Sequence, residues 1–414
     1  MPIRPFYESD WSDAGAAQGM DHVNRLPPMV EASISHFPAL GLSFSVVEAE
    51  SGAVEPWLQK SWEALVVHSD SPEAVFQTPA YFEFISAVPN IKNTQKLVLL
   101  RETDSHRIVG VVPLRAGRRT LSLALGGKAV ARLRLKTTAL LGSIPLAPHD
   151  PAVLEMLFDF IFEAFPQTSS IAMQAIPAES DFYRTLTGSS YLRKRYGFYI
   201  KDGWRTCQTT PLPGHYAEYL ARFKAKKRYN LQRQIKLLER CTGPLRLTRI
   251  DGLEHIPLLL ASIRQIALPH AEVQMMNEAQ YKALVQRKIA LCYVLHGGDR
   301  SCAVVIGIRS HTTYHVHNIL YDQSLATDSP GTSILHLAIE DLIEHQHITL
   351  VDYGYGDPQY SQQSSNIEKL RSQVFVYQRT WANRLLLATY SGFGLLVDWG
   401  KRFRSHPLRK PRPA

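Results

Sequence analysis

Two stretches of the chain, LVLLRETDSHRIVGVVPLR at residues 97–115 and LCYVLHGGDRSCAVVIGIR at residues 291–309, can be superimposed without a gap. Each begins with Leu, turns at a polar segment near its middle and ends on an apolar residue followed by Arg. Apolar runs on both sides of a short polar turn predict a β-hairpin. The two stretches begin 194 residues apart. A period of this length predicts two copies of one domain and not a solenoid of short repeats.

The same order of elements follows each hairpin. The first copy continues with an apolar helix, predicted at 153–165, and a strand at 170–176. The second copy continues with a strand at 313–321, an apolar helix at 332–346 and a strand at 348–353. This alternation predicts an α/β fold with mixed sheets flanked by helices.

These patterns divide the chain into five parts. We expect an arm without regular structure at 1–40, a first domain at 41–213, a basic linker helix at 214–243, a second domain at 244–382, and a C-terminal helix with a basic tail at 383–414. The linker is expected to be one long helix. Gly392 and Gly394 argue against a single regular helix near the C-terminus.

Composition excludes several classes of protein. The 414 residues are 45% hydrophobic and 20% charged, which excludes a disordered chain. The four cysteines show no spacing typical of a disulfide framework or a zinc site. No apolar run is long enough to cross a bilayer, and the N-terminus lacks the apolar core of a secretory signal. We expect a cytoplasmic protein, with no structural metal.

The net charge of +9 is concentrated in three segments. Residues 115–136 carry seven Lys or Arg and no acid, residues 224–249 carry nine against one Glu, and residues 401–414 carry six and no acid. Such patches favour phosphate-bearing partners: a coenzyme, RNA or anionic lipid. The last patch follows an apolar segment, which predicts peripheral membrane contact or a helix docked on the second domain.

Titratable residues gather on the strands of the second copy. His315 and His317 lie two apart on a predicted strand and therefore share one face, where either could serve as a base near neutral pH. The alternative is that they are ordinary core histidines. No third metal ligand lies nearby in the sequence, so no metal is expected. Asp352 ends the next strand, either as an amine-binding carboxylate or base, or as a turn cap.

The helix that opens at Pro330 offers an anion site. Helix N-termini present N–H groups and a positive dipole end, and Gly331 permits close approach of a phosphate to the backbone. The alternative interpretation is simply a well-capped helix.

Three stretches carry a resemblance to a known family. They are AKKRYNLQRQIKLLE at 225–239, SPGTSIL at 329–335 and VDYGYGDPQY at 351–360. They are similar to the basic opening KxRxxLRRxxxxLE, the PG-x-x-L helix start and the DFG-x-GD-x-x-Y stretch of the CelD-like (cellulose-biosynthesis-type) GNAT acetyltransferases. The tandem arrangement around a basic helix also resembles the Fem-type aminoacyltransferases more distantly.

The resemblance implies tandem GNAT-like domains and transfer of an acyl group from acyl-CoA, with acetyl-CoA as co-substrate, to a small-molecule amine. In family members of this kind, backbone N–H groups at a splayed central strand polarise the acyl carbonyl. The catalytic residues would be His317, Asp352, His315 and Tyr360. The residues at the donor would be Gly331, Thr332, Ser333, Lys227 and Arg228.

Two alternatives remain open. One is a Fem-type transferase that takes its group from aminoacyl-tRNA or an acyl carrier protein, with the basic linker helix contacting that partner. The other is a catalytically degenerate GNAT pair that acts as a binding module. Ser361 stands where family members commonly have Lys, and the phosphate loop at 328–333 retains a single Gly.

Overall fold

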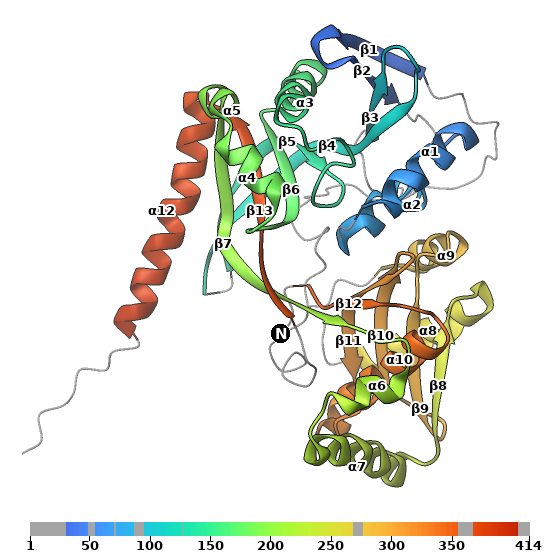
Figure 1. The fold of residues 1–414 in the computed structure, drawn as a ribbon. Coiled ribbons are helices and arrows are strands. Elements are labelled where there is room, and N and C mark those ends of the chain that lie inside the picture. The colour runs from blue at the N-terminus through green and yellow to red at the C-terminus, as the bar shows by residue number, and fades with distance from the viewer. Residues whose placement is uncertain are drawn as a thin grey trace, which may run out of the picture.

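The computed structural model describes residues 30–48, 54–69, 72–86, 95–126, 128–267, 276–354 and 367–404. Its named strands form one twisted sheet, with the first half of the chain above the second in Figure 1. Helices cover both faces of the sheet. This architecture confirms the predicted α/β class.

The strands are β1 (Val30–Phe37), β2 (Leu42–Glu48), β3 (Gln95–Glu102), β4 (Ile108–Leu125), β5 (Lys128–Leu140), β6 (Ser170–Pro177), β7 (Tyr196–Pro211), β8 (Leu245–Ile250), β9 (Cys292–Gly297), β10 (Arg300–Arg309), β11 (Thr313–Tyr321), β12 (Leu350–Asp352) and β13 (Ile367–Gln378).

The α-helices are α1 (Pro56–Val67), α2 (Pro79–Ser86), α3 (Pro151–Ala164), α4 (Asp181–Gly188), α5 (Ser190–Arg195), α6 (Tyr216–Ala221), α7 (Ala225–Thr242), α8 (Ile256–Ala267), α9 (Glu278–Gln286), α10 (Pro330–Glu344) and α12 (Trp381–Arg404). Short 3₁₀ helices include η2 (Pro72–Gln77), η3 (Leu253–His255) and η4 (Gln323–Asp328).

The strand order shows the duplication directly. It runs β1-β2-β3-β4-β5-β6-β13-β7-β12-β11-β10-β9-β8. The pair β5–β6 in the first half and the pair β11–β12 in the second half are parallel, and the other ten pairs are antiparallel. The two stretches that superimpose in sequence form the hairpins β3–β4 and β9–β10. Each parallel pair is connected through an apolar helix, α3 or α10.

The two halves exchange a strand, which the sequence did not predict. β13 follows the second half in the chain but inserts between β6 and β7 of the first half. β7 in turn pairs with β12 of the second half. Figure 1 shows β7 and β13 running together from one half toward the other. The expected boundaries at 213 and 382 therefore do not separate two independent sheets.

The halves also share a hydrophobic core. On one face of the second half, α8 and α9 pack against the sheet together with Val75, Phe76 and Tyr81 of the first half. On the opposite face, α10 packs with α6 and α7. In the first half, α3 covers one face of the sheet, while α1 and α2 cover the other. Segment η2–α2 therefore belongs to the first half in sequence and to the second half in packing.

Three expectations differ from the structure near the ends and the linker. Residues 30–37 of the expected arm form β1, which pairs with β2. The expected single linker helix is two helices, broken between Ala221 and Ala225. Buried Phe223 sits at the break, and the Arg228 guanidinium donates a hydrogen bond to its carbonyl oxygen (2.7 Å).

The C-terminal segment is one continuous helix, α12, despite its two glycines. It docks on the first half and not on the second domain, as Leu387 packs against Leu121, Leu135 and Phe375. This docked surface offsets the roughly 1 kcal/mol that each Gly costs inside a helix. Within the described residues, no helix is both long enough and apolar enough to cross a bilayer.

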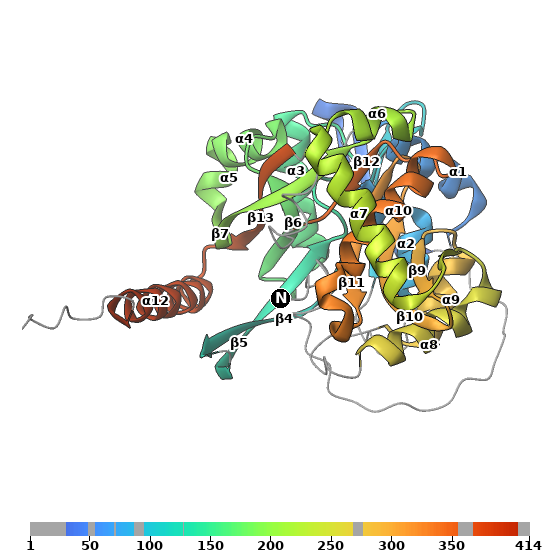
Figure 2. The ribbon, with the colours of Figure 1, turned by 90° about the horizontal axis from the view of Figure 1, so that it is seen from below.

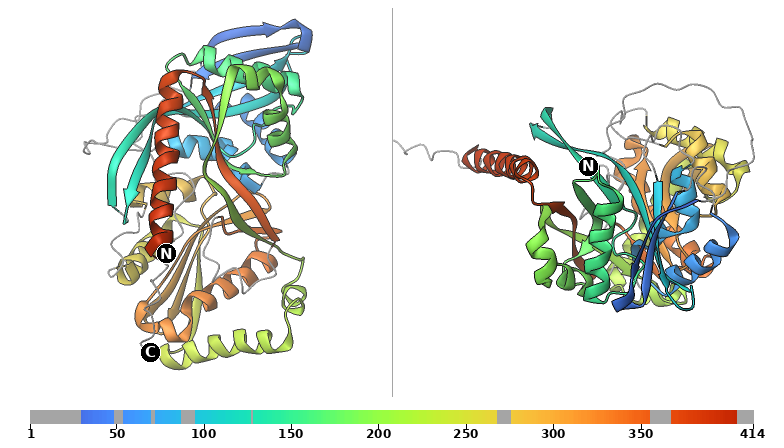
Figure 3. Two further views of the ribbon diagram at one scale, coloured as in Figure 1. Left: turned by 90° about the vertical axis from the view of Figure 1, so that its left-hand side faces the viewer. Right: turned by 90° about the horizontal axis from the view of Figure 1, so that it is seen from above.

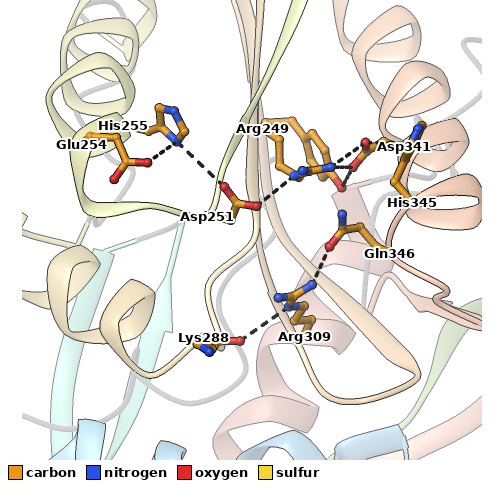
Figure 4. A network of polar contacts seen from close by, with 10 residues as sticks. Arg249, Asp251, Glu254, His255, Lys288, Arg309, Asp341, His345 and Gln346 are labelled. Atoms are coloured by element: carbon orange, nitrogen blue, oxygen red, sulfur yellow. Dashed lines mark hydrogen bonds and ion pairs between the residues drawn. The ribbon is translucent and has the colours of Figure 1, made fainter.

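A polar network fixes the far end of α10 to the sheet (Figure 4). Asp341 of α10 accepts hydrogen bonds from Arg249 Nη1 of β8 (3.0 Å) and from the hydroxyl of Tyr293 on β9 (2.9 Å). Arg249 also pairs with Asp251 (2.9 Å). Because Tyr293 is buried, its hydroxyl depends on Asp341 for a partner within this network.

Asp341→Ala should lower the free energy of unfolding by about 1–3 kcal/mol, since it removes the acceptor of a buried hydroxyl and of a half-buried guanidinium. Urea unfolding measures the change. Glu254→Ala, which removes an exposed carboxylate of the same network, should cost under about 1 kcal/mol. Equal losses in the two variants would contradict the role given to Asp341.

Candidate active site

The candidate site lies where the parallel strands β11 and β12 part. Their pairing covers only three residue pairs and ends at His315 opposite Asp352. β11 continues to Tyr321 along β10, whereas β12 ends at Asp352. We call this divergence the fork. The structure therefore brings together two of the predicted catalytic residues, which are 37 positions apart in the chain.

A buried ion cluster closes the base of the fork. The Arg371 guanidinium on β13 donates through Nη1 to Asp352 Oδ2 (2.6 Å) and to Glu73 Oε1 of η2 (3.0 Å). The other oxygen of Asp352 accepts the backbone N–H of Gly354 (2.7 Å). All three charged side chains are at most 3% exposed. Buried charges of this kind persist only when they are paired and hydrogen-bonded.

The cluster sets the charge of its members. Burial favours the neutral form of Asp352, but the Arg371 guanidinium, the charge of His315 and the Gly354 N–H together hold the pKa of Asp352 below its ordinary value. Burial likewise opposes the charge of Arg371, yet Asp352 and Glu73 hold its pKa above the ordinary value. With both oxygens engaged, Asp352 is suited to positioning its neighbours more than to accepting a proton.

His317 lies next to the cluster on the same face of β11. A β-bulge opposite Ile306 and Gly307 places it as an extra residue in the strand. The Phe76 ring lies 5.1 Å from the His315 ring and 6.4 Å from the His317 ring, between centroids. Burial, together with the charge of His315, lowers the pKa of His317 to about 4. Its imidazole is therefore neutral at pH 7 and able to accept a proton.

The same cluster offers a set of oxygen and nitrogen donors. One ligand atom each from Glu73, His315 and Asp352 lies within 4.8 Å of the others, a grouping that could hold a metal ion. Glu73 supplies the third donor that was not found near the histidines in the sequence. Both carboxylates already share the Arg371 guanidinium, so a divalent ion would have to displace a bonded cation. We interpret the cluster as an ion pair network.

The predicted donor residues at α10 differ in what they offer. Ser329 precedes the helix in a left-handed conformation (φ 56°), and Gly331 is buried directly after Pro330. The first N–H groups of a helix lack intrahelical acceptors, which leaves those of Gly331 and Thr332 for an anion. In contrast, the N–H and hydroxyl of Ser333 both donate to the Ser329 carbonyl (3.0 and 3.1 Å).

Lys227 and Arg228 lie in the first turn of α7, and the charge of Lys227 reaches His336 of α10, whose pKa burial and that charge lower. Lys227 Nζ lies 4.6 Å from the centre of the Phe223 ring, and burial lowers its pKa. Arg228 is engaged at the α6–α7 break. The α7 residue that reaches the start of α10 is Gln234, whose amide donates to Ser329 Oγ (3.3 Å). Sequence reasoning missed it because it carries no charge.

Tyr360, the fourth predicted catalytic residue, lies outside the described residues. The structure adds three residues to the site: Glu73, Phe76 and Arg371. No local pattern marks them, because Glu73 and Arg371 are 298 positions apart in the chain. Arg371 does stand three positions before the apolar run VFV at 374–376, which is a weak hint of a buried cation.

Residues 225–362 match the family model described as "Acetyltransferase (GNAT) domain". This part of the second half, about a third of the chain, is thus similar to GNAT-type acetyltransferase domains. The match spans α7, the fork and α10. The comparison with curated proteins gives no match.

Several solved structures are similar to this chain over most of its length. The crystal structure of FemX is similar with a TM-score of 0.55 at 10% identity, covering 77% of this chain and 96% of FemX. A tandem GNAT protein from the clavulanic acid biosynthesis pathway scores 0.47 at 11% identity, covering 81% and 98%. L-PGS from Bacillus licheniformis scores 0.46 at 12% identity, covering 81% and 96%. At these identities the likeness to FemX shows the fold alone, and the two lower scores carry no argument.

Arg371→Met should lower the free energy of unfolding by about 3–5 kcal/mol at pH 7.5, because it leaves two carboxylates buried without a cation. In the wild type, the contribution of ionised Asp352 is complete above the ordinary Asp pKa of about 4 and is lost as the pH falls below it. In the variant, burial raises the pKa of both carboxylates. The deficit relative to wild type should therefore shrink at pH 5.

The matched control is Arg246→Met, which removes an exposed strand Arg on β8 and should change stability little at either pH. Urea unfolding of the three proteins at both pH values gives the comparison. A deficit in Arg371→Met that is the same at pH 5 and pH 7.5 would show that the two carboxylates are not left charged by the substitution.

Proposed function

We propose that this chain is an N-acyltransferase that moves an acyl group from a CoA thioester to an amine of a small molecule. The observation that carries the proposal is the fork between β11 and β12. The fork lies in the part of the chain that matches the GNAT domain model. There β11 carries the neutral His317, parts from β12, and leads through η4 to the start of α10. The finer likeness to CelD-like members is part of this proposal.

The donor would bind with its phosphates at the start of α10. The N–H groups of Gly331 and Thr332, and the positive end of the helix, favour a diphosphate there. The acyl arm would then reach the fork, where β11 extends beyond its pairing with β12. Backbone N–H groups along β11 would polarise the thioester carbonyl as negative charge develops on its oxygen.

The acceptor amine attacks in its neutral form, and its nitrogen loses a proton as the amide forms. In the proposed reaction that nitrogen bonds to the carbonyl carbon, the carbon–sulfur bond breaks, and the proton lost by the nitrogen passes through His317 to the leaving CoA thiolate. His317 would accept the amine proton, because its imidazole is neutral at working pH. His315 and Asp352 would position it, and Tyr360 would orient the acyl group.

A second candidate is transfer from aminoacyl-tRNA. The specific observation in its favour is a row of exposed cations on and beside α7, comprising Arg222, Lys224, Lys226, Arg233, Lys236 and Arg240. Such a donor predicts tRNA binding that weakens steeply with salt. It also predicts that free acetyl-CoA does not bind. An acyl carrier protein would show salt dependence without any affinity for RNA.

His317→Gln should lower kcat by about 10²-fold or more, because the residue that accepts the amine proton is lost. The pKa of His317 is about 4, so its protonation should not lower the wild-type rate until the pH falls toward that value. Release of CoA thiol from acetyl-CoA, followed with a panel of small amines, measures both effects.

The matched control is His311→Gln, which changes an exposed residue in the turn before β11 and should leave the rate unchanged. If His317→Gln retains the wild-type rate with the best acceptor, His317 has no part in proton transfer.

Thr332→Asp should weaken acetyl-CoA binding at least about tenfold while leaving the fold intact. An acidic residue in the first turn suits the helix dipole but repels the donor phosphates. Thermal unfolding with increasing acetyl-CoA measures the change in affinity. A ligand that binds only the folded state stabilises it by about 2.7 kcal/mol at a hundredfold excess over Kd.

Ala152→Asp provides the control in the other copy. Ala152 is exposed in the first turn of α3, the helix that corresponds to α10. Weakened binding in Ala152→Asp with normal binding in Thr332→Asp would move the donor to the first half and overturn the proposed site.

A further inference from the structure

The outer face of α12 is apolar and exposed from Trp381 to Trp399. Five large side chains on it are between 60% and 77% exposed, namely Trp381, Leu385, Leu395, Leu396 and Trp399. With Ala388 and Gly392, four of them recur at alternating intervals of four and three residues, and Leu396 adjoins Leu395. This spacing places them on one side of an α-helix. We call this set the outer stripe.

The opposite side of α12 is already used. Leu387 is buried against the sheet, Asn383 donates to the Gln378 carbonyl (2.9 Å), and the Tyr390 hydroxyl donates to Asp202 (2.9 Å). On a helical wheel these three positions lie about 180° from the outer stripe. Figures 1 and 2 show the helix projecting from the body, and Figure 3 shows it beside the β4–β5 hairpin. The outer stripe therefore points away from the molecule.

The sequence around the stripe is strongly basic. From Arg384 to the C-terminus, the chain carries seven Lys or Arg and one acid, Asp398. The hairpin beside α12 adds exposed Lys128, Arg132 and Arg134, with no acid between residues 115 and 136. An apolar helix face with aromatic residues at both ends and surrounding cations is the composition of helices that lie in a membrane interface.

We propose that α12 binds the surface of an anionic lipid bilayer through the outer stripe. The stripe spans the 19 residues 381–399, or about 27 Å of helix, and would lie parallel to the membrane plane. Its Trp and Leu side chains enter the boundary between headgroups and acyl chains, while the basic residues pair with lipid phosphates. The inference is independent of the proposed acyl transfer.

Charge argues for lipid over a second copy of the chain. Two copies paired through the outer stripe would bring two strongly basic segments together, and like charges across an interface oppose association. An anionic surface instead gains from each of these cations, at about 1 kcal/mol per Lys or Arg close to the membrane.

Vesicle sedimentation tests the proposal on the full-length protein. We expect binding to vesicles of phosphatidylcholine mixed with phosphatidylglycerol, weaker binding to phosphatidylcholine alone, and loss of binding as salt is raised. The double variant Leu396→Ser/Trp399→Ser should bind the mixed vesicles at least about tenfold more weakly, because it removes two exposed apolar side chains of the stripe.

The matched control, Trp57→Ser/Leu253→Ser, removes the same two residue types from exposed positions on α1 and η3 and should bind as the wild type does. Wild-type protein that stays in solution with the mixed vesicles overturns the proposal, as does a stripe variant that binds normally. A dimer that dissociates in the stripe variant, without any vesicle binding, would assign the stripe to a second copy.

Discussion

The Arg371 guanidinium, held between Glu73 and Asp352, is the interaction on which the rest of this structure depends. Its three members come from η2, β12 and β13, and they meet in the interior. Each buried carboxylate remains charged there only because the guanidinium pairs with it. The buried guanidinium likewise depends on both carboxylates. One cation therefore ties a segment of the first half to the two strands that close the fork in the second half.

The position of the candidate site follows from this tie. Because Glu73 is anchored, η2 carries Phe76 onto the rings of His315 and His317. The histidines face the side of the sheet covered by α8, α9 and η2, whereas α10 covers the opposite side. In the proposed mechanism the fork connects the two sides, with the donor phosphates at α10 and the acceptor beside the histidines. The first copy would then shape the acceptor side without holding a donor itself.

Local patterns predicted much of the fold. The expected strand at 313–321 is β11, and the expected strand at 170–176 is β6 to within one residue, because side-chain periodicity is a local property. The placement of β13 between β6 and β7 was missed. Both faces of its apolar run are buried, and such a run does not indicate which strands will pair with it. The break at Phe223 and the continuity of α12 through its glycines likewise depend on docking, which outweighs propensity.

The candidate site divides in the same way. His315 and Asp352 were identified from residue type and strand position, and their pairing follows from parallel strands in one domain. Glu73 and Arg371 belong to other parts of the chain and become neighbours only through the strand exchange. Lys227 and Arg228 were chosen for charge, whereas the contact to the start of α10 is made by uncharged Gln234.

The central claim is that the donor binds in the second copy, from the start of α10 to the fork. Hydrogen–deuterium exchange of the wild-type protein with and without acetyl-CoA tests this most directly. The account predicts slower exchange at residues 316–321 and 331–332 in the presence of acetyl-CoA, with the start of α3 unchanged. Protection at the start of α3 instead, or no protection at saturating acetyl-CoA, would contradict it.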